Sequence, residues 1–114
     1  MDEVLRRAFL YDFYGELLTA HQREVYEAVV QNDLSYSEAA EEFGVSRQGV
    51  HDLVKRCEKS LEQYELKLHL VERFLTIRAK VQRIQDLASH CEEIDREAFA
   101  GQVAELSGQI LEEL

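Results

Sequence analysis

Side chains able to read bases and neutralise phosphates lie close together in the middle of this chain. Arg47 can donate two hydrogen bonds to O6 and N7 of guanine, and Gln48 can pair with N6 and N7 of adenine. Lys55, Arg56 and Lys59 are cations that can contact phosphates. The predicted nucleic-acid-binding residues are Ser46, Arg47, Gln48, His51, Asp52, Lys55, Arg56 and Lys59.

Ordinary roles on a helix surface could explain the same side chains. Arg47 and Gln48 could simply be exposed residues at the start of a helix. The three cations could form ion pairs at helical spacing with Asp52, Glu58 or Glu62. Both interpretations stay open on residue types alone.

The residues around this set follow the pattern of two short helices joined by a tight turn. Ser35 and Glu38 form a Ser-x-x-Glu capping box at the start of the first helix. Gly44 suits the left-handed conformation that ends this helix, and Ser46 can cap the next one. The pattern predicts a helix-turn-helix whose reading helix covers residues 47–56.

Small and apolar residues occupy the positions where these two helices should meet. Ala40 is expected at a close helix crossing, and Val45 is expected to fill the turn. The residues expected to fill the space between the helices are Ala39, Phe43, Val50 and Leu53.

Composition predicts an all-α chain. The 114 residues are 46% hydrophobic and include no proline and only 5 glycines, which favours helices with short connections. The formal net charge of -10 is unusual for a DNA-binding protein. Residues 47–59, however, hold four basic and two acidic residues, a local net charge of +2. We therefore expect weak, strongly salt-dependent binding to nucleic acid of arbitrary sequence.

The long C-terminal part of the chain carries two heptad seams that differ by one residue in phase. The first continues the reading helix through Tyr64 and Leu68, and the second begins at Leu70. The change of phase predicts a break near residues 68–70. A second boundary is expected near residues 93–95, followed by a last helix. The residues expected on the inner face of that helix are Phe99, Val103, Leu106, Ile110 and Leu111.

This organisation predicts a helix-turn-helix head over residues 1–62 and a helical extension over residues 63–114. The extension could form a helical hairpin or pair with a second copy, and we favour a homodimer. The residues expected to line the dimer or partner interface are Tyr64, Leu68, Val71, Phe74, Ile77, Val81 and Ile84. The acidic residues of 85–114 could also compete with phosphate for the reading helix.

The sequence gives little support for catalysis. It has no glycine-rich phosphate loop, no nucleophile motif and no carboxylate pair in an apolar setting, so we predict neither an enzyme nor a cofactor. His90, Cys91 and Glu93 are close in sequence but would point in different directions on a helix. Four convergent ligands would be needed for a structural metal site, so none is predicted.

A location in the cytoplasm is also expected. No apolar run approaches the roughly 18 residues needed to span a bilayer, and the first residues lack the layout of a secretory signal. Cys57 and Cys91 have no Cys-x-x-Cys spacing, so each is expected to be a buried or half-buried thiol in a reducing compartment.

Three motifs, in order along the chain, resemble the YlxM family of small cytoplasmic bacterial proteins. They read LYDFYGELLT at residues 10–19, LSYSEAAEEFGVSRQGVHD at residues 34–52, and KRCEKSLEQYELKL at residues 55–68. Gln22 and Arg23 follow the first motif and also match. The resemblance extends over about residues 5–85. It implies an all-α protein whose helix-turn-helix is similar to the sigma-factor region that reads the −35 promoter element.

The resemblance also implies a function. Genes of this family usually neighbour those of the signal recognition particle GTPases. We therefore expect a regulatory protein of co-translational targeting, with DNA or the particle RNA as nucleic-acid partner and the particle GTPase as a candidate protein partner. The alternatives are a DNA-binding transcription regulator unrelated to targeting, and a helical adaptor that binds no nucleic acid.

Overall fold

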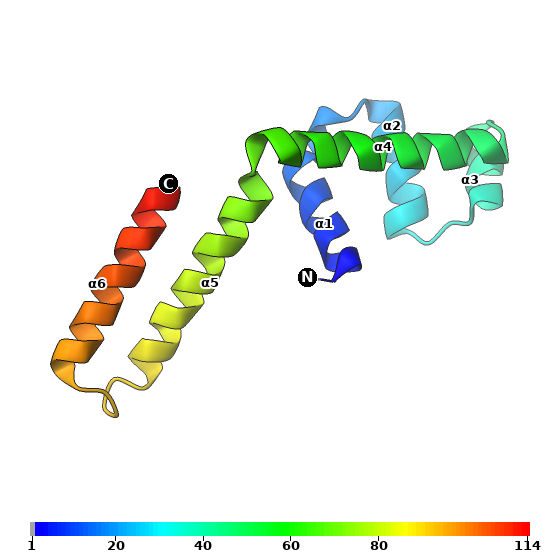
Figure 1. Cartoon of the computed structure of the whole chain (residues 1–114). Helices are drawn as coiled ribbons and strands as arrows, with labels where there is room; N and C mark the ends of the chain where they lie inside the picture. The colour runs from blue at the N-terminus through cyan, green and yellow to red at the C-terminus, as the bar shows by residue number, and fades with distance from the viewer. Residues whose placement is uncertain (1) are drawn as a thin grey trace. The chain divides into compact units, whose positions relative to one another are not determined.

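All regular elements of residues 2–114, the residues described by a computed structural model, are helices (Figure 1). The helices are α1 (Glu3–Tyr14), α2 (Ala20–Tyr26), α3 (Tyr36–Phe43), α4 (Arg47–Leu68), α5 (Leu70–Ser89) and α6 (Arg96–Glu113). A short 3-10 turn (Gly15–Leu17) follows α1, and a π-helical turn (Glu27–Gln31) continues α2. The predicted all-α class is confirmed. Within these residues, no helix is both long and apolar enough to cross a membrane.

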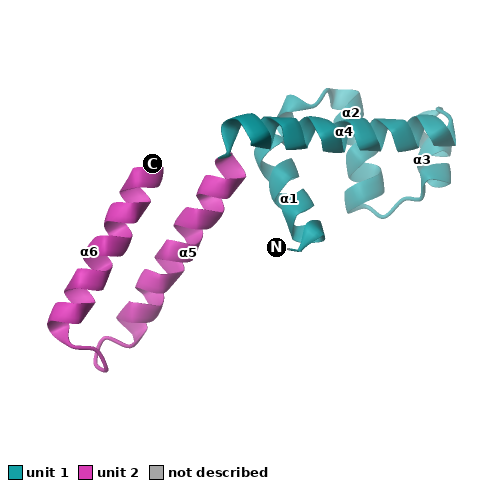
Figure 2. Cartoon of the chain, in the orientation of Figure 1, with its two compact units in different colours: residues 1–69 teal, residues 70–114 magenta. Residues whose placement is uncertain are grey.

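The chain divides into two compact units, residues 1–69 and residues 70–114 (Figure 2). The first unit contains α1 to α4, and the second contains α5 and α6. The division falls after the predicted boundary at residue 62 because α4 continues without interruption and remains part of the head. Leu61 and Glu65 of α4 are both buried.

The helix starts of the head have local caps. Thr19 and Gln22 form a reciprocal capping box at α2. The predicted box at α3 is present: the Glu38 N–H donates to Ser35 Oγ at 3.0 Å, and the Ser35 N–H donates to Glu38 Oε1 at 3.1 Å. These caps satisfy N–H groups that have no partner inside the helix.

The core of the head forms where α1, α2 and α3 pack against α4. Its buried apolar residues are Leu10, Tyr14, Leu18, Val25, Tyr26, Ala28, Ala39, Val50, Val54, Cys57 and Leu61. Burial raises the pKa of the Cys57 thiol, and a buried position was predicted for this cysteine.

One packing prediction around the turn needs correction, and the close helix crossing expected at Ala40 stays a prediction. Ala39 is the fully buried small residue of α3, whereas Ala40 is only half-buried. Val45 is 40% exposed and does not fill the turn. The left-handed Gly44, with φ of 68°, ends α3 and turns the chain toward α4 without a side-chain plug.

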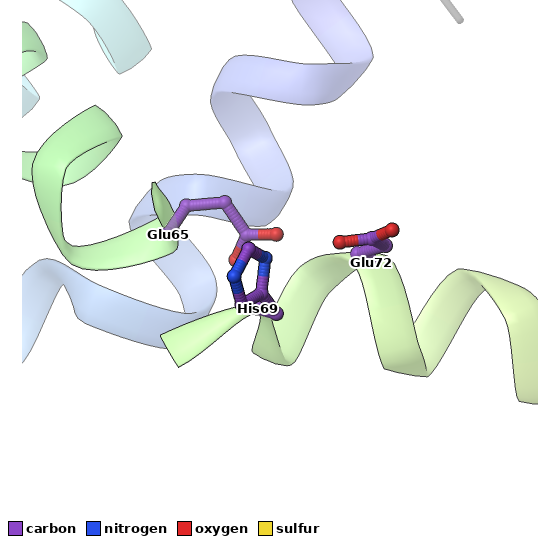
Figure 3. A group of neighbouring side chains, drawn as sticks. All are labelled: Glu65, His69 and Glu72. Atoms are coloured by element: carbon purple, nitrogen blue, oxygen red, sulfur yellow. The ribbon is translucent and has the colours of Figure 1, made fainter. Parts of the chain in front are cut away.

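The predicted break near residues 68–70 lies at His69. This residue adopts a left-handed conformation with φ of 56°, and its N–H donates to the Glu65 carbonyl oxygen at 2.8 Å. A left-handed residue after the last turn is a common way to end a helix, although glycine usually supplies it. Figure 3 shows the side chains of Glu65 and His69 at this end of α4; Glu72, also labelled there, belongs to the second unit.

The second unit is a hairpin in which α5 and α6 pack against one another. Asp95 caps α6 by accepting a hydrogen bond from the Ala98 N–H, as the predicted boundary near residues 93–95 requires. Leu106 is buried, and the half-buried residues on the same side of α6 are Phe99, Val103 and Ile110. Two expectations fail here: Leu111 is 71% exposed, and Cys91 is exposed in the loop before α6.

Candidate nucleic-acid interface

The predicted binding residues all lie on the first turns of α4 or at its cap. Ser46 caps this helix, with its Oγ accepting a hydrogen bond from the Gly49 N–H at 2.9 Å. Val50 and Val54 are buried against the rest of the head and so fix the rotation of the helix about its axis. At about 100° per residue, the predicted binding residues of α4 occupy roughly half of the helix circumference. Gln48, Asp52 and Lys59 lie opposite these valines, whereas Arg47 lies within about 60° of them, at the edge of this surface.

These side chains are accessible. Arg47, Gln48 and Asp52 are exposed, as are the three cations of the following turns, whereas His51 is half-buried. The structure therefore places them on one surface of one helix, and it places no buried core residue among them. We call this surface the reading face, and it consists of Arg47, Gln48, His51, Asp52, Lys55, Arg56 and Lys59.

Gln48 is held by an acid of its own helix. Its Nε2 donates to Asp52 Oδ1 at 2.9 Å, and His51 Nδ1 lies 3.4 Å from the same oxygen. The Gln48 amide first and the His51 ring second hold the pKa of the Asp52 carboxyl below its ordinary value. The amide expected to recognise a base therefore already has a charged acceptor one turn away.

His51 is oriented by α3. Its ring meets the ring of Tyr36 edge-on, with centroids 5.4 Å apart and an interplanar angle of 82°. Tyr36 is the first residue of α3, so this contact links the start of one helix to the second turn of the other. The contact between Tyr36 and His51 therefore connects the reading face to α3.

The cations of the reading face fall into two groups. Lys55 Nζ lies 3.7 Å from Glu58 Oε2, and Glu58 Oε1 lies 3.6 Å from Arg7 of α1. Within residues 2–114 no carboxylate lies in ion-pair distance of Arg47, Arg56 or Lys59. Lys55 therefore forms the kind of helix-surface ion pair that the sequence allowed as an alternative to phosphate binding. The other three cations are exposed to solvent.

Two arginines of α1 lie beside this surface, and sequence reasoning did not select them. Arg6 forms an ion pair of 2.5 Å with Glu62, and this hydrogen bond raises the pKa of the Arg6 guanidinium. Arg7, with Glu58 and Lys59, lines an open groove between α1 and α4. The two adjacent arginines can be seen in the sequence. That they lie beside α4, however, depends on how α1 packs against α4 and could not be predicted from residue spacing.

Tyr26 forms part of the wall of the same groove. Burial, followed by the nearby Glu58 carboxylate, raises the pKa of its phenol to about 12. The phenol therefore stays neutral at physiological pH and contributes to packing rather than to charge.

The residues expected at a dimer or partner interface differ in exposure. Tyr64 is half-buried in the head, where its ring lies 6.0 Å from that of Tyr14. Leu68, Phe74 and Val81 are exposed. Val71 is buried, and Ile77 and Ile84 are half-buried. An interface through all seven residues stays a prediction.

Comparison with known proteins agrees with this fold. Residues 1–99 match the family described as "Putative helix-turn-helix protein, YlxM / p13 like". A UPF0122 protein of Thermoanaerobacter sp. is 42% identical over 113 residues, which are 99% of this chain and 97% of the relative.

Two further relatives give similar values. A UPF0122 protein of Caldanaerobacter subterraneus is 47% identical over 85 residues, covering 75% of this chain and 73% of the relative. A UPF0122 protein of Bacillus cereus is 41% identical over 97 residues, covering 85% and 88% respectively. On these matches and on the helix-turn-helix described above, the chain belongs to the YlxM/p13-like family of helix-turn-helix proteins.

Proposed function

We propose that this protein is a regulatory nucleic-acid-binding protein of the signal recognition particle pathway, and that it binds through residues 46–59. The observation that carries the proposal is the reading face, where Arg47, Arg56 and Lys59 are exposed and no carboxylate of residues 2–114 lies in ion-pair distance of them. Cations without ion-pair partners on one exposed helix can neutralise phosphates in register. The role in targeting rests on the family resemblance alone.

The proposal also covers the cellular location, the partners and the oligomeric state of the protein. It acts in the cytoplasm, where its head takes the part of the −35-reading region of a sigma factor. Its nucleic-acid partner is DNA or the signal recognition particle RNA, and the particle GTPase is a candidate protein partner. It acts as a homodimer.

A second candidate is a transcription regulator that reads DNA and has no part in targeting. Arg47 and Gln48, the first two residues of α4, favour it, because both side-chain types form bidentate contacts with purines in the major groove. Phosphate contacts alone would not require these two types at the end of the helix that enters the groove.

Binding to two labelled nucleic acids separates these candidates. The probes are DNA from the promoter of the protein's own operon and the signal recognition particle RNA, with fluorescence anisotropy measured from low to roughly physiological salt, about 0.15 M. The variants are Arg47→Ala and Arg56→Ala. Lys67→Ala is the matched control, because Lys67 is an exposed cation in the last turn of the same helix.

Each outcome has a distinct meaning. If Arg56 contacts a DNA phosphate, its loss lowers the slope of log K against log salt by about 0.9, while Lys67→Ala leaves the slope unchanged. RNA binding without DNA binding supports the targeting role, and the reverse supports the transcription regulator. If neither probe binds at low salt, or if all three variants behave alike, nucleic-acid binding through the reading face is wrong.

A further inference from the structure

The hairpin of α5 and α6 has very little core of its own. Leu106 is the buried residue of α6 and Val71 that of α5, whereas Ile77, Lys80 and Ile84 of α5 are only half-buried. Helices of this length are marginal in water without packing against other apolar surface. The hairpin, residues 70–114, is only slightly longer than the roughly 40 residues below which a unit usually needs oligomerisation, a metal or a disulfide to be stable. The hairpin therefore needs an additional apolar surface.

One side of the hairpin is polar. Arg83, Asp86 and Gln102 line one shallow pocket between the two helices, and Glu105 and Gln109 line a second one beside it. These charged and amide groups are suited to water. A covering partner is not expected on this side.

The opposite side carries a second apolar seam on α6. The residues that face α5 are Phe99, Val103, Leu106 and Ile110, spaced four, three and four apart. Each is followed directly by a residue of the second seam, which consists of Ala100, Ala104, Ser107 and Leu111. Two adjacent heptad seams are typical of a helix that contacts two neighbours in a bundle. Within this hairpin, α6 has α5 as one neighbour.

All four residues of this second seam are exposed. Three of them are small, so another helix can approach closely. The hydroxyl of Ser107 donates to the carbonyl oxygen of Val103 at 2.8 Å, which satisfies it without water. The seam can therefore be covered without leaving a polar group unpaired.

The same side of α5 presents Val81, which is 49% exposed, and Ala88 one heptad later. At about 100° per residue, these two residues lie on the side of α5 turned away from Arg83 and Asp86. The hairpin thus has a polar side and an apolar side. We call the apolar side, formed by Val81, Ala88, Ala100, Ala104, Ser107 and Leu111, the small-residue face.

Charge distinguishes the two helices. In α5 four basic residues oppose two acidic ones, a net charge of +2, whereas in α6 one basic residue opposes four acidic ones, a net charge of -3. A partner that offers both a basic and an acidic helix side by side would match this distribution. A second copy of the same hairpin is such a partner.

We infer that the small-residue face binds a second copy of this chain, forming a four-helix bundle in which α5 of each copy lies over α6 of the other. A two-fold axis parallel to the helices produces this arrangement and places the basic helix against the acidic one. The other face-to-face arrangement, with the axis across the helices, places α5 on α5 and α6 on α6, so like charges meet. Both chains then enter the bundle at the same end.

This inference rests on the homodimer of the proposed function and deepens it by naming the interface, and it involves no nucleic acid. Its first test is the molar mass of the pure protein in solution, measured by light scattering after gel filtration at about 100 µM, where a dimer with a Kd of about 1 µM would be mostly assembled. The expected value is twice the chain mass of 13.3 kDa. A monomer at this concentration overturns the inference together with the proposed homodimer, whereas nucleic-acid binding through the reading face is tested separately by the anisotropy experiment.

A matched pair of variants locates the interface. Ala104→Arg places a cation on the small-residue face, opposite the basic α5 of the other copy, and is expected to give a monomer. Gln102→Arg adds the same charge to the polar side of the same helix and is expected to remain a dimer. Equal behaviour of the two variants contradicts the interface, provided that circular dichroism shows both to be helical.

Cross-linking gives a test that does not depend on a disruptive variant. In a Cys91→Ser background, chains carrying Val81→Cys and chains carrying Ala104→Cys are mixed and oxidised. A mixed disulfide is expected because α5 of one copy lies over α6 of the other. This arrangement brings positions 81 and 104 to the Cα separation of about 4.4–6.8 Å that a disulfide requires. Disulfides formed between two Val81→Cys chains instead would overturn the proposed arrangement.

Discussion

The Nε2 of Gln48 donates a hydrogen bond of 2.9 Å to Oδ1 of Asp52, one turn further along α4. Both residues belong to the reading face, and Asp52 is exposed there. An exposed carboxylate in the middle of this surface opposes phosphate by charge and competes with a base for the Gln48 amide. Asp52 is thus a candidate determinant of both affinity and selectivity.

Two substitutions at Asp52 separate these effects. Asp52→Asn removes the charge but keeps an acceptor for Gln48, so we expect a few-fold tighter binding to all nucleic acids. Asp52→Ala also frees the amide, so we expect in addition a changed preference for adenine, a contact worth about 1–3 kcal/mol. Anisotropy with paired probes that differ in one adenine measures both.

Asp86→Asn is the charge control for these substitutions, because Asp86 is an acid of the second unit and lies outside the reading face. If it tightens binding as much as Asp52→Asn, the effect reflects net charge alone. The role assigned to Asp52 would then be wrong.

The capping box of α3 gives a stability prediction. Ser35→Ala removes the acceptor of the Glu38 N–H, so we expect a loss of about 0.5–2 kcal/mol in the free energy of unfolding, measured with urea. Ser37→Ala changes the same residue type two positions later, where no cap is formed, and should cost much less. An equal loss in both variants would mean that the cap contributes little.

The same box predicts a pH dependence. The Ser35 N–H first, and its hydroxyl second, lower the pKa of the Glu38 carboxyl below its ordinary value. A carboxyl whose pKa is lower in the folded state stabilises the fold above its unfolded pKa, and this contribution disappears as the pH falls through the folded pKa. The stability difference between the wild type and Glu38→Gln should therefore shrink below about pH 4. A difference that stays constant down to about pH 2 would contradict this account.

The sequence predicted local structure better than it predicted contacts. The Ser35–Glu38 capping box and the left-handed Gly44 are local signals, and both correspond to features of the structure. The two heptad seams also located the break at His69, although no glycine marks it.

Errors arose where the outcome depends on which elements pack together. Leu111 is apolar, but it comes one residue after Ile110, which faces α5. Leu111 therefore points to another side of α6 and is exposed on the hairpin. Arg7 reaches Glu58 only because α1 packs along α4, and no residue spacing reveals that packing. Periodicity identifies an apolar face, whereas the partner of that face depends on the fold.

The buried carboxylate of Glu65 provides a further stability prediction. Glu65 is only 7% exposed, and its Oε1 accepts a hydrogen bond of 2.6 Å from the Tyr14 hydroxyl. Tyr14→Phe removes this donor while keeping the ring, so we expect a loss of about 1–3 kcal/mol in the free energy of unfolding. Tyr64→Phe is the control, because it removes the hydroxyl of a neighbouring, half-buried tyrosine. Equal effects would show that the hydrogen bond to Glu65 is not the cause.

Two glycines should respond in opposite directions to alanine. Gly44 has φ of 68°, so Gly44→Ala forces an L side chain into the left-handed region at a cost of about 1–2 kcal/mol. Gly101 lies within α6, and a Cβ added there would meet nothing within 4 Å. Gly101→Ala should therefore stabilise α6 by about 0.5–1 kcal/mol, because alanine loses less backbone entropy in a helix. Thermal unfolding followed by far-ultraviolet circular dichroism should show a lower Tm for Gly44→Ala and a higher one for Gly101→Ala. A higher Tm for Gly44→Ala would mean that the turn between α3 and α4 tolerates another conformation, and the reading helix would then not be held by a left-handed residue.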